Sequence, residues 1–146
     1  MQGTFKSETQ FEKRLELCTR LRKQHPDRIP IIVEVAKNSQ LTIKCRKFLA
    51  PSEISIGGFL NVIRKQASIG YEEACFIFCG TAGTLVPTSN TMAQVYEKYK
   101  DEDGFLYIIV ALENTFGVLN TLDSWTFDLL NGILASSGRV VRGLVL

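Results

Sequence analysis

Five consecutive apolar residues, CFIFC, occupy positions 75–79. Successive side chains of a β-strand point to opposite faces of its sheet, so a strand of this composition is apolar on both faces. We therefore expect a central strand that is covered on each side. The turn-forming residues GTAG follow directly and should end it.

Helical and extended patterns alternate around this strand. Apolar residues recur at helical spacing in 11–24, in the segment that Ser55 can cap, and in 91–99, so we expect a helix in each. The apolar stripe of the first helix consists of Phe11, Leu15, Cys18 and Leu21. Runs rich in Val and Ile predict further strands at RIPIIVEVA (28–36), KCRKFLAP (44–51) and GFLYIIVAL (104–112).

This order of elements predicts one α+β domain. A ubiquitin-like β-grasp accommodates it, as a four-stranded mixed sheet packed on a helix and preceded by an N-terminal helical extension. The short strand that ends at Pro51 is expected at an edge of the sheet. At 146 residues, 45% of them hydrophobic, the chain is long enough for one such domain and an appendage.

The charge pattern excludes one class of ligand. A formal net charge of +2 is too small for a domain whose main ligand is nucleic acid. Residues 1–28 carry an excess of Lys and Arg, which forms either a partner-binding surface or an ordinary solvated helix face. Residues 1–10 lack the apolar core of a signal peptide, so we expect a cytoplasmic location.

The cysteines and the histidine give no indication of a metal, cofactor or catalytic site. A zinc site needs about four clustered ligands, and the sequence spreads its candidates widely: Cys18, His25, Cys45, Cys75 and Cys79. Cys75 and Cys79 would lie about 13 Å apart on a strand, too far for a disulfide. We expect four reduced thiols and no enzyme; a Cys–His nucleophile is the alternative, but nothing places His25 beside a cysteine.

Four blocks of the sequence resemble a known family in order and spacing. They are FEKRLELCTRLRKQHPDRIPIIVE, KFLAPSEISIGGFLNVIRKQ, PTSNTMAQVYEKYKDEDGFLY and ENTFG. They are similar to the autophagy-related protein 8 family of ubiquitin-like modifiers. The resemblance covers residues 5–117. It implies a β-grasp domain in 1–117, with two N-terminal helices within 1–25, and a non-enzymatic role in autophagosome formation and selective autophagy.

The resemblance also gives Phe116 and Gly117 a role. Members of the family are made as precursors, and a cysteine protease removes everything after this glycine. Ubiquitin-like activating and conjugating enzymes then join the glycine to phosphatidylethanolamine on autophagosome and cytoplasmic vesicle membranes. A glycine suits this reaction because it leaves the carboxyl unhindered on a mobile tail.

Two side-chain pockets beside the edge strand are also implied. They would take an aromatic-x-x-aliphatic motif of an autophagy receptor, which binds as an added strand. The aromatic pocket consists of Leu21, Pro30, Ile32, Lys47, Leu49 and Phe105. The aliphatic pocket consists of Phe48, Ala50, Pro51, Ile54, Phe59 and Val62. Acidic neighbours of the motif could pair with Arg28, Arg46, Lys47 and Arg64.

Four features depart from the family pattern. The run Lys44-Cys45-Arg46-Lys47 before the edge strand lacks one usual basic residue and has a basic residue in place of an acidic one, and the turn CGTAGT after the central strand is two residues longer. Leu17 replaces a residue that is often acidic and enlarges the apolar surface beside the aromatic pocket. Gln66 replaces a residue that is usually basic and weakens the charge near the aliphatic pocket. We therefore expect receptor preference to differ from that of common family members.

The extension 118–146 leaves several hypotheses open. Its apolar residues Val118, Leu122, Trp125, Leu129 and Ile133 fall on one helical stripe. The preferred interpretation is a removed propeptide; the alternatives are a retained element that packs on the domain or a bilayer, and translated non-coding sequence. The rival function is an unconjugated adaptor that keeps this tail and binds cytoskeletal or trafficking partners, microtubules among them, through its basic N-terminal helix.

Overall fold

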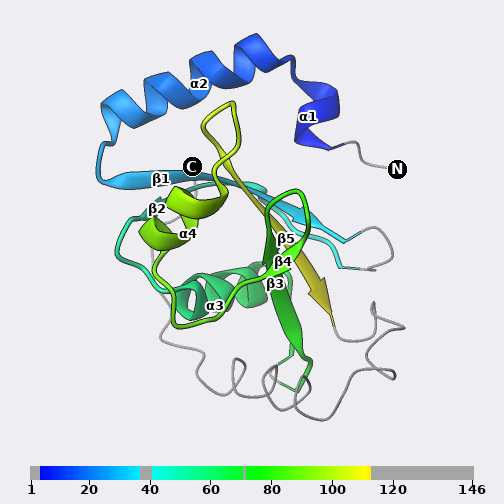
Figure 1. Cartoon of the computed structure of the whole chain (residues 1–146). Helices are drawn as coiled ribbons and strands as arrows, with labels where there is room; N and C mark the ends of the chain where they lie inside the picture. The colour runs from blue at the N-terminus through cyan, green and yellow to red at the C-terminus, as the bar shows by residue number, and fades with distance from the viewer. Residues whose placement is uncertain (1–3, 37–40, 71, 113–146) are drawn as a thin grey trace.

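The computed structural model describes residues 4–36, 41–70 and 72–112 (Figure 1). In chain order the elements are α1 (Phe5–Glu8), α2 (Phe11–Gln24), β1 (Arg28–Val35), β2 (Lys47–Pro51), α3 (Ile56–Gln66), β3 (Cys75–Cys79), β4 (Thr84–Leu85), α4 (Met92–Tyr99) and β5 (Leu106–Leu112). The sheet order is β2-β1-β5-β3-β4. β1 and β5 pair in parallel and every other neighbouring pair is antiparallel, so the sheet is mixed, as expected.

Within the described residues the sheet has five strands, and the prediction of four was wrong. The additional strand, β4, consists only of Thr84 and Leu85, which pair with the end of β3. Gly80 and Gly83 make this return possible, because their φ angles of 80° and 65° lie in the left-handed region that glycine tolerates. The GTAG turn therefore ends β3, as predicted, and also folds the chain back onto it.

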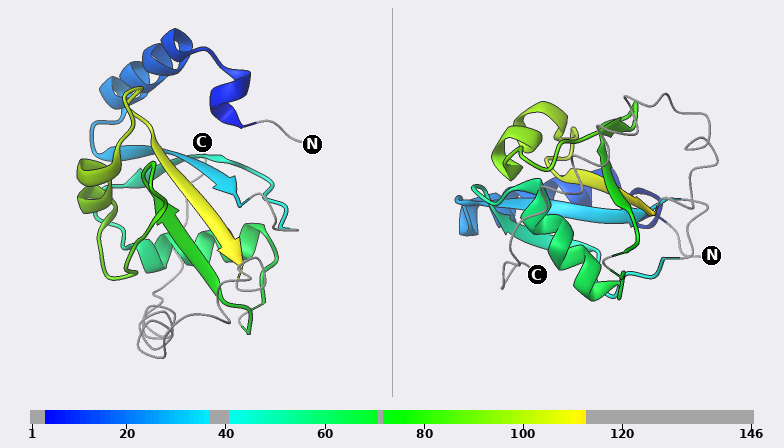
Figure 2. Two further views of the ribbon diagram at one scale, coloured as in Figure 1. Left: turned by 45° about the vertical axis from the view of Figure 1, so that its right-hand side comes forward. Right: turned by 90° about the horizontal axis from the view of Figure 1, so that it is seen from below.

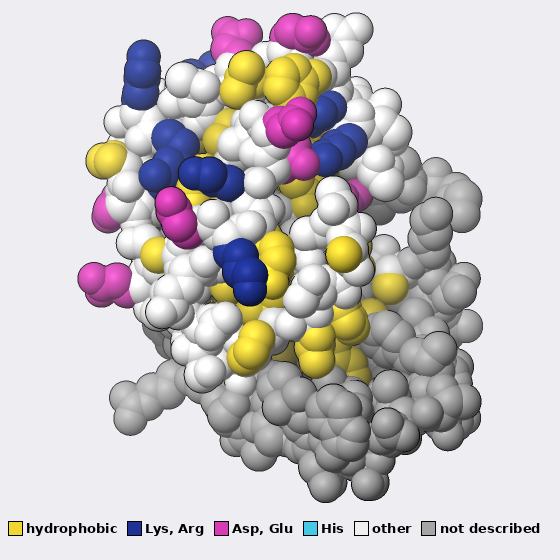
Figure 3. Space-filling view, in the orientation of Figure 1, with side chains coloured by type: hydrophobic (Ala, Val, Ile, Leu, Met, Phe, Trp, Pro, Cys, Tyr) yellow, Lys and Arg dark blue, Asp and Glu magenta, His cyan; other side chains and the backbone are white. Residues whose placement is uncertain are grey.

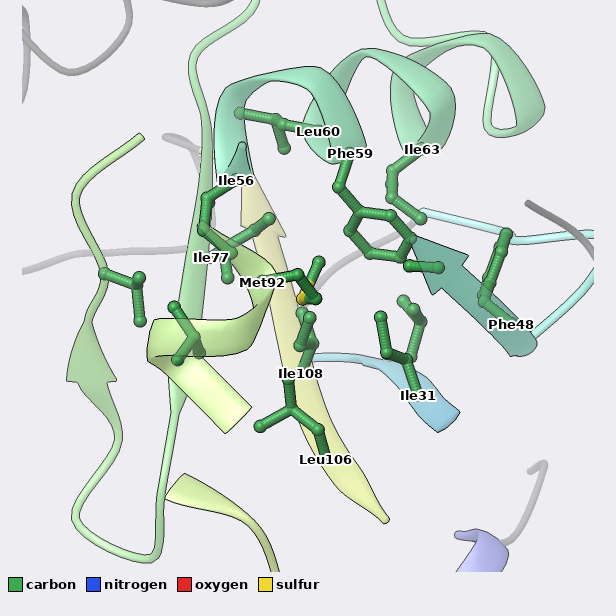
Figure 4. Packing of buried hydrophobic residues seen from close by; sticks show 14 of the residues in the cluster. Ile31, Phe48, Ile56, Phe59, Leu60, Ile63, Ile77, Met92, Leu106 and Ile108 are labelled. Carbon is green, nitrogen blue, oxygen red and sulfur yellow. The ribbon is translucent and has the colours of Figure 1, made fainter. Parts of the chain in front are cut away.

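The sheet lies between two layers of helix. α3 covers one face, and α1 and α2 lie on the opposite side (Figures 1 and 2). The main core fills the space between the sheet and α3, where Phe59, Phe48 and Ile31 converge from a helix and two strands and Met92 arrives from α4 (Figure 4). All four side chains are 0% exposed.

Side-chain caps fix the starts of the two body helices. The Ser55 hydroxyl accepts a 3.0 Å hydrogen bond from the amide of Gly58, which confirms Ser55 as the cap of α3. At α4, Thr91 accepts from the amide of Gln94, while the Gln94 side chain accepts from the amide of Thr91. This reciprocal pair is a capping box, and it begins the helix at Met92.

The buried face of α2 differs from the predicted stripe. Phe11 and Leu15 are 38% and 41% exposed, whereas Arg14 and Cys18 are buried. Arg14 takes the inward position because acceptors for its guanidinium lie there, including the backbone carbonyl of Thr9 at 2.5 Å. Helical periodicity located the helix correctly but could not identify a charged residue on its inner face.

Candidate functional site

β2 is an edge strand, since β1 is its only neighbour among the described strands. The antiparallel register runs from Arg28 opposite Pro51 to Ile32 opposite Lys47. The outer side of an edge strand carries backbone N–H and C=O groups that an extended peptide can pair with. The expected edge position is confirmed.

Alternate side chains of β2 point to opposite faces of the sheet. Phe48 and Ala50 enter the main core and are 0% exposed. Lys47 points to the face that carries the N-terminal helices, where its Nζ lies 5.4 Å from the ring centre of Phe5. Leu49 shares that face by alternation. β2 thus stabilises the fold with one set of side chains and contributes to the candidate site with the other.

The structure brings residues of the predicted aromatic pocket together. Ile32 and Phe105 are both 0% exposed in a small second core cluster, and Leu21 of α2 packs against it. Cross-strand pairing places Leu49 directly opposite Pro30. Side chains from α2, β1, β2 and the residue before β5 therefore gather in the same region of the molecule.

Phe5 of α1 occupies this region, which the sequence reasoning did not foresee. Phe5 is 2% exposed and belongs to the same cluster. Its ring meets that of Phe105 edge-on, with centres 5.5 Å apart and planes at 77°. A second ring contact, to Tyr107, has a centre-to-centre distance of 6.5 Å. The one available signal was Thr4, whose hydroxyl caps α1 by accepting from the amide of Ser7 at 3.1 Å.

The predicted aliphatic pocket belongs to the main core. Five of its six residues are buried: Phe48, Ala50, Ile54, Phe59 and Val62. Phe48 and Phe59 pack edge to face with ring centres 5.3 Å apart. Only Pro51 is partly exposed. A ligand at this position would therefore rest on Pro51 and on the outer edges of buried side chains.

Three of the predicted cations lie along β2. Lys47 is exposed. Arg46, directly before it, forms an ion pair with Glu8 of α1. Arg28 donates from Nη1 to the backbone carbonyl of Leu49 at 3.1 Å. Two of these side chains thus already contact an acceptor that a bound peptide would have to share or replace.

The fourth cation, Arg64, points inward. It is 8% exposed and donates from Nη1 to the backbone carbonyls of Gly70 and Glu73 at 3.0 and 2.9 Å. These bonds hold the loop that follows α3. Gln66, at the end of the same helix, has its side-chain oxygen buried without a hydrogen-bond partner in the described part of the chain.

Asp103 attaches α2 to the sheet beneath the site. Its carboxylate is 0% exposed and accepts from Arg14 Nε at 2.8 Å, from the Tyr107 hydroxyl at 2.5 Å and from the amide of Phe105 at 2.9 Å. The hydrogen bond to Asp103 raises the pKa of Arg14. Burial, and then the same carboxylate, raises the pKa of Tyr107. Both donors therefore keep their protons at neutral pH.

Figure 3, in the orientation of Figure 1, shows basic and acidic side chains side by side on the part of the surface where the N-terminal helices lie.

Among the described residues, no helix has the length and hydropathy needed to cross a membrane. The same residues contain no group of three or more His, Cys, Asp or Glu side chains suited to a metal ion. Phe116, Gly117 and the extension 118–146 lie outside the described residues.

A comparison with family models decides the relationship of this chain to known proteins. Residues 13–117 match the model described as Autophagy protein Atg8 ubiquitin like. The chain belongs to the Atg8 family. It is thus a ubiquitin-like autophagy protein, and the resemblance inferred from the sequence blocks is confirmed.

Individual Atg8 proteins match most of the chain. Autophagy-related protein 8e of Arabidopsis thaliana is 48% identical over 114 residues, which are 77% of this chain and 92% of the relative. Autophagy-related protein 8 of Mycosarcoma maydis is 45% identical over 120 residues, 82% of this chain and 100% of the relative. The crystal structure of Trypanosoma brucei ATG8 has a TM-score of 0.73 at 41% identity and covers 80% of this chain and 100% of its own. The ubiquitin-like fold is thereby confirmed.

Proposed function

We propose that this protein is a ubiquitin-like modifier that is conjugated through Gly117 to phosphatidylethanolamine and docks autophagy receptors on the membrane. The observation that carries the proposal is the edge strand β2 in an Atg8-family chain, with the side chains of the aromatic pocket gathered beside it. An aromatic-x-x-aliphatic peptide would add a strand to β2, and Lys47 would attract its acidic neighbours.

The conjugation half of the proposal concerns the chain's C-terminal part. The residues matched by the family model run to Gly117, and residues 118–146 follow it. A cysteine protease would remove this extension by hydrolysing the peptide bond between Gly117 and Val118. Activating and conjugating enzymes would then activate the freed carboxyl with a nucleoside triphosphate and carry it as a thioester on an enzyme cysteine. The amine of phosphatidylethanolamine would attack this thioester, so that an amide bond to Gly117 forms as the enzyme thiol leaves. Autophagosome and vesicle membranes are the location that this chemistry implies.

Mass spectrometry and liposome flotation test the conjugation. The full chain, Gly117→Ala, and a chain that ends at Gly117 would be incubated with protease, conjugation enzymes and liposomes that contain phosphatidylethanolamine. We expect the full chain to be trimmed to Gly117 and to float, the truncated chain to float without protease, and Gly117→Ala to stay full length and in solution. Flotation of Gly117→Ala together with loss of flotation on truncation would make the extension the membrane element and reject the proposal.

The unconjugated adaptor remains the second candidate, because α2 presents Phe11 and Leu15 to solvent at 38% and 41% exposure. These two side chains lie one helical turn apart on one face, as a helical docking surface requires. An adaptor would keep its tail. An intact C-terminus at Leu146 in the protein isolated from its own cells would favour this candidate over conjugation.

A further inference from the structure

The outer edge of β2 combines an open strand edge with positive charge. Among the described strands β2 pairs only with β1, so its other side is available to an added strand. Lys47 is exposed at its start, and Arg46 directly precedes it. The occupant that suits this edge is therefore an extended, acidic segment with an aromatic and an aliphatic side chain.

Residues 127–130 of this chain, FDLL, have the aromatic-x-x-aliphatic pattern that the proposed site would bind. Acidic side chains accompany the pattern, with Asp128 inside it and Asp123 shortly before it. The longer stretch 113–138 contains Glu113 as a further acidic residue and no Lys or Arg. Its charge is thus opposite to that of the β2 edge, and complementary charges favour binding in the correct register.

The connection from the domain is long enough to bring this motif to β2. The register puts Leu49 of β2 level with Phe105, seven residues before Leu112 at the end of β5. That separation is about 23 Å along the strands, and three strand spacings add about 14 Å across them, which gives about 27 Å in a straight line. The 15 residues from Leu112 to Phe127 span up to about 50 Å. Another aromatic-x-x-aliphatic pattern begins at Phe116, but its four-residue connection spans only about 13 Å and cannot reach Leu49.

The direction of approach agrees with the order of the two pockets. β5 is parallel to β1 and β2 is antiparallel to it, so Leu112 lies at the end of the sheet where β2 begins. A segment that comes from Leu112 along β2 reaches the aromatic pocket beside Leu49 before the aliphatic position at Pro51. Phe127 precedes Leu130 in the same order. The motif can therefore add in parallel to β2 without a reversal of the chain.

We propose that residues 123–130 are an intramolecular ligand of the β2 edge, with Phe127 in the aromatic pocket and Leu130 at the aliphatic position, and that they occupy the site until the chain is cut after Gly117. This inference rests on the proposed docking function. The bond to be cut lies between the domain and the motif, so its hydrolysis turns a tethered ligand into a free peptide. Processing would thereby open the docking site to receptors as well as expose the glycine carboxyl.

Tethering gives a weak motif enough strength for this role. A flexible connection of this length produces an effective concentration of about 1 mM. At that concentration a motif whose Kd as a free peptide is about 100 µM occupies its site in about nine molecules in ten. A receptor peptide then binds with an apparent Kd about tenfold weaker than its Kd for the vacant site. After cleavage, with protein and peptide at about 1 µM, the same motif would fill only about 1% of the sites.

Calorimetric titration of the full chain with a synthetic peptide that carries acidic residues before a Trp-x-x-Leu motif tests the inference. The double variant Phe127→Ala/Leu130→Ala removes both anchors of the tail motif, and we expect the peptide to bind it about tenfold more tightly than wild type. Trp125→Ala is the matched control, because it removes an aromatic side chain just before the motif and should leave the affinity unchanged. A chain that ends at Gly117 keeps every helix and strand of the structure and should bind like the double variant.

The outcomes separate this inference from the docking proposal. Equal affinity of the wild type and the double variant leaves docking intact and rejects occupancy by the tail motif. Tighter binding by Trp125→Ala than by the double variant would show that the apolar stripe of the extension, which includes Trp125, covers the site, and this result also rejects the inference. If neither the full chain nor any of its variants binds the peptide, the docking proposal itself fails.

A second measurement distinguishes the protein's own tail from the tail of a second copy. The amide chemical shifts of Lys47 and Leu49 should differ between the full chain and the double variant. The difference should persist on about tenfold dilution, because intramolecular occupancy does not depend on protein concentration. Loss of the difference on dilution would make a second copy the occupant and overturn the intramolecular assignment.

Discussion

Arg14 Nε and Asp103 Oδ2 lie 2.8 Å apart in a pair whose side chains are 10% and 0% exposed. The two residues are far apart in sequence, and their contact joins α2 to the start of β5. The carboxylate also accepts hydrogen bonds from the Tyr107 hydroxyl and the Phe105 amide, so both of its oxygens are paired. Removing one partner should therefore lower the free energy of unfolding by more than the loss of a surface ion pair would.

Asp103→Ala should lower the free energy of unfolding by about 3–5 kcal/mol, because it leaves the guanidinium of Arg14 buried without its partner. Asp101→Ala is the comparison, since its pair with Lys6 is partly exposed and should contribute about 1 kcal/mol or less. Urea denaturation measures both. The double variant Arg14→Ala/Asp103→Ala should lose less than the sum of the single losses; simple additivity would show that the pair is not coupled.

Gly104→Ala should destabilise the protein for two reasons. Gly104 has a φ of 92°, and an added Cβ would lie 2.7 Å from Cys18 Sγ. Gly83→Ala shares the first problem only, because its φ is 65° and nothing lies within 4 Å of an added Cβ. We expect a loss of about 1–2 kcal/mol for Gly83→Ala, and at least about 1 kcal/mol more for Gly104→Ala from overpacking. Equal midpoints of thermal denaturation for the two variants would show that the contact with Cys18 Sγ does not add to the cost of Gly104→Ala.

The native protein should expose one reactive thiol. Burial raises the pKa of Cys18 and Cys75 to about 11 and that of Cys79 to about 12, whereas Cys45 is only partly buried. Thiolates are the reactive form, so iodoacetamide at pH 7.5 should label Cys45 alone. Peptide mapping after brief labelling checks this result, with protein unfolded in urea as the control that labels all four. Rapid labelling of Cys18 would indicate that α2 separates from the sheet.

The attachment of α1 should be insensitive to pH from 7 to 5 and should weaken below about pH 4. Burial alone would raise the pKa of Asp101, but hydrogen bonds from Lys6 and from the amide of Asp103 outweigh it and leave this pKa below its ordinary value of 3.8. The stabilisation is therefore complete above that value and is lost as the pH falls through the lowered pKa. Amide chemical shifts of Lys6 and Ser7 report it, and a transition between pH 5 and 6 would implicate a different group.

Lys47→Glu should make the binding free energy of an acidic receptor peptide less favourable by about 1 kcal/mol at low salt, and it should reduce the salt dependence of the peptide's affinity. Lys98→Glu makes the same change of charge at an exposed position on α4 and should have little effect. Equal effects of the two variants would mean that net charge, not position beside β2, controls binding.

The sequence supported the order of elements because that order depends on local patterns. The cap at Ser55, the helix after Thr91 and the strands rich in Val and Ile were all identified from neighbouring residues, and the structure places them as expected. β4 was missed because two residues carry no periodicity. Its existence depends on the backbone conformation of Gly80 and Gly83.

The candidate site could be predicted only in part. The edge position of β2 was expected from the order of elements and agrees with the sheet order. The resemblance supplied Leu21, Ile32 and Phe105 as pocket residues, and the structure brings these three side chains together. The inward Arg14 and the position of Phe5 depend on contacts with residues around 100 positions away in the chain, such as Asp103 and Phe105. Local spacing contains no information about such partners.

The parallel pairing of β1 with β5 has a consequence for the synthesis of the protein. The centre of the sheet joins β1 to β5, the first and the last of the described strands, with Ile31 opposite Leu106. A nascent chain that has not yet reached β5 can form its helices and the β1–β2 hairpin but has no partner for the other side of β1. One side of β1 therefore stays an unpaired strand edge until residues 106–112 have emerged from the ribosome. Non-local pairing of this kind also slows folding.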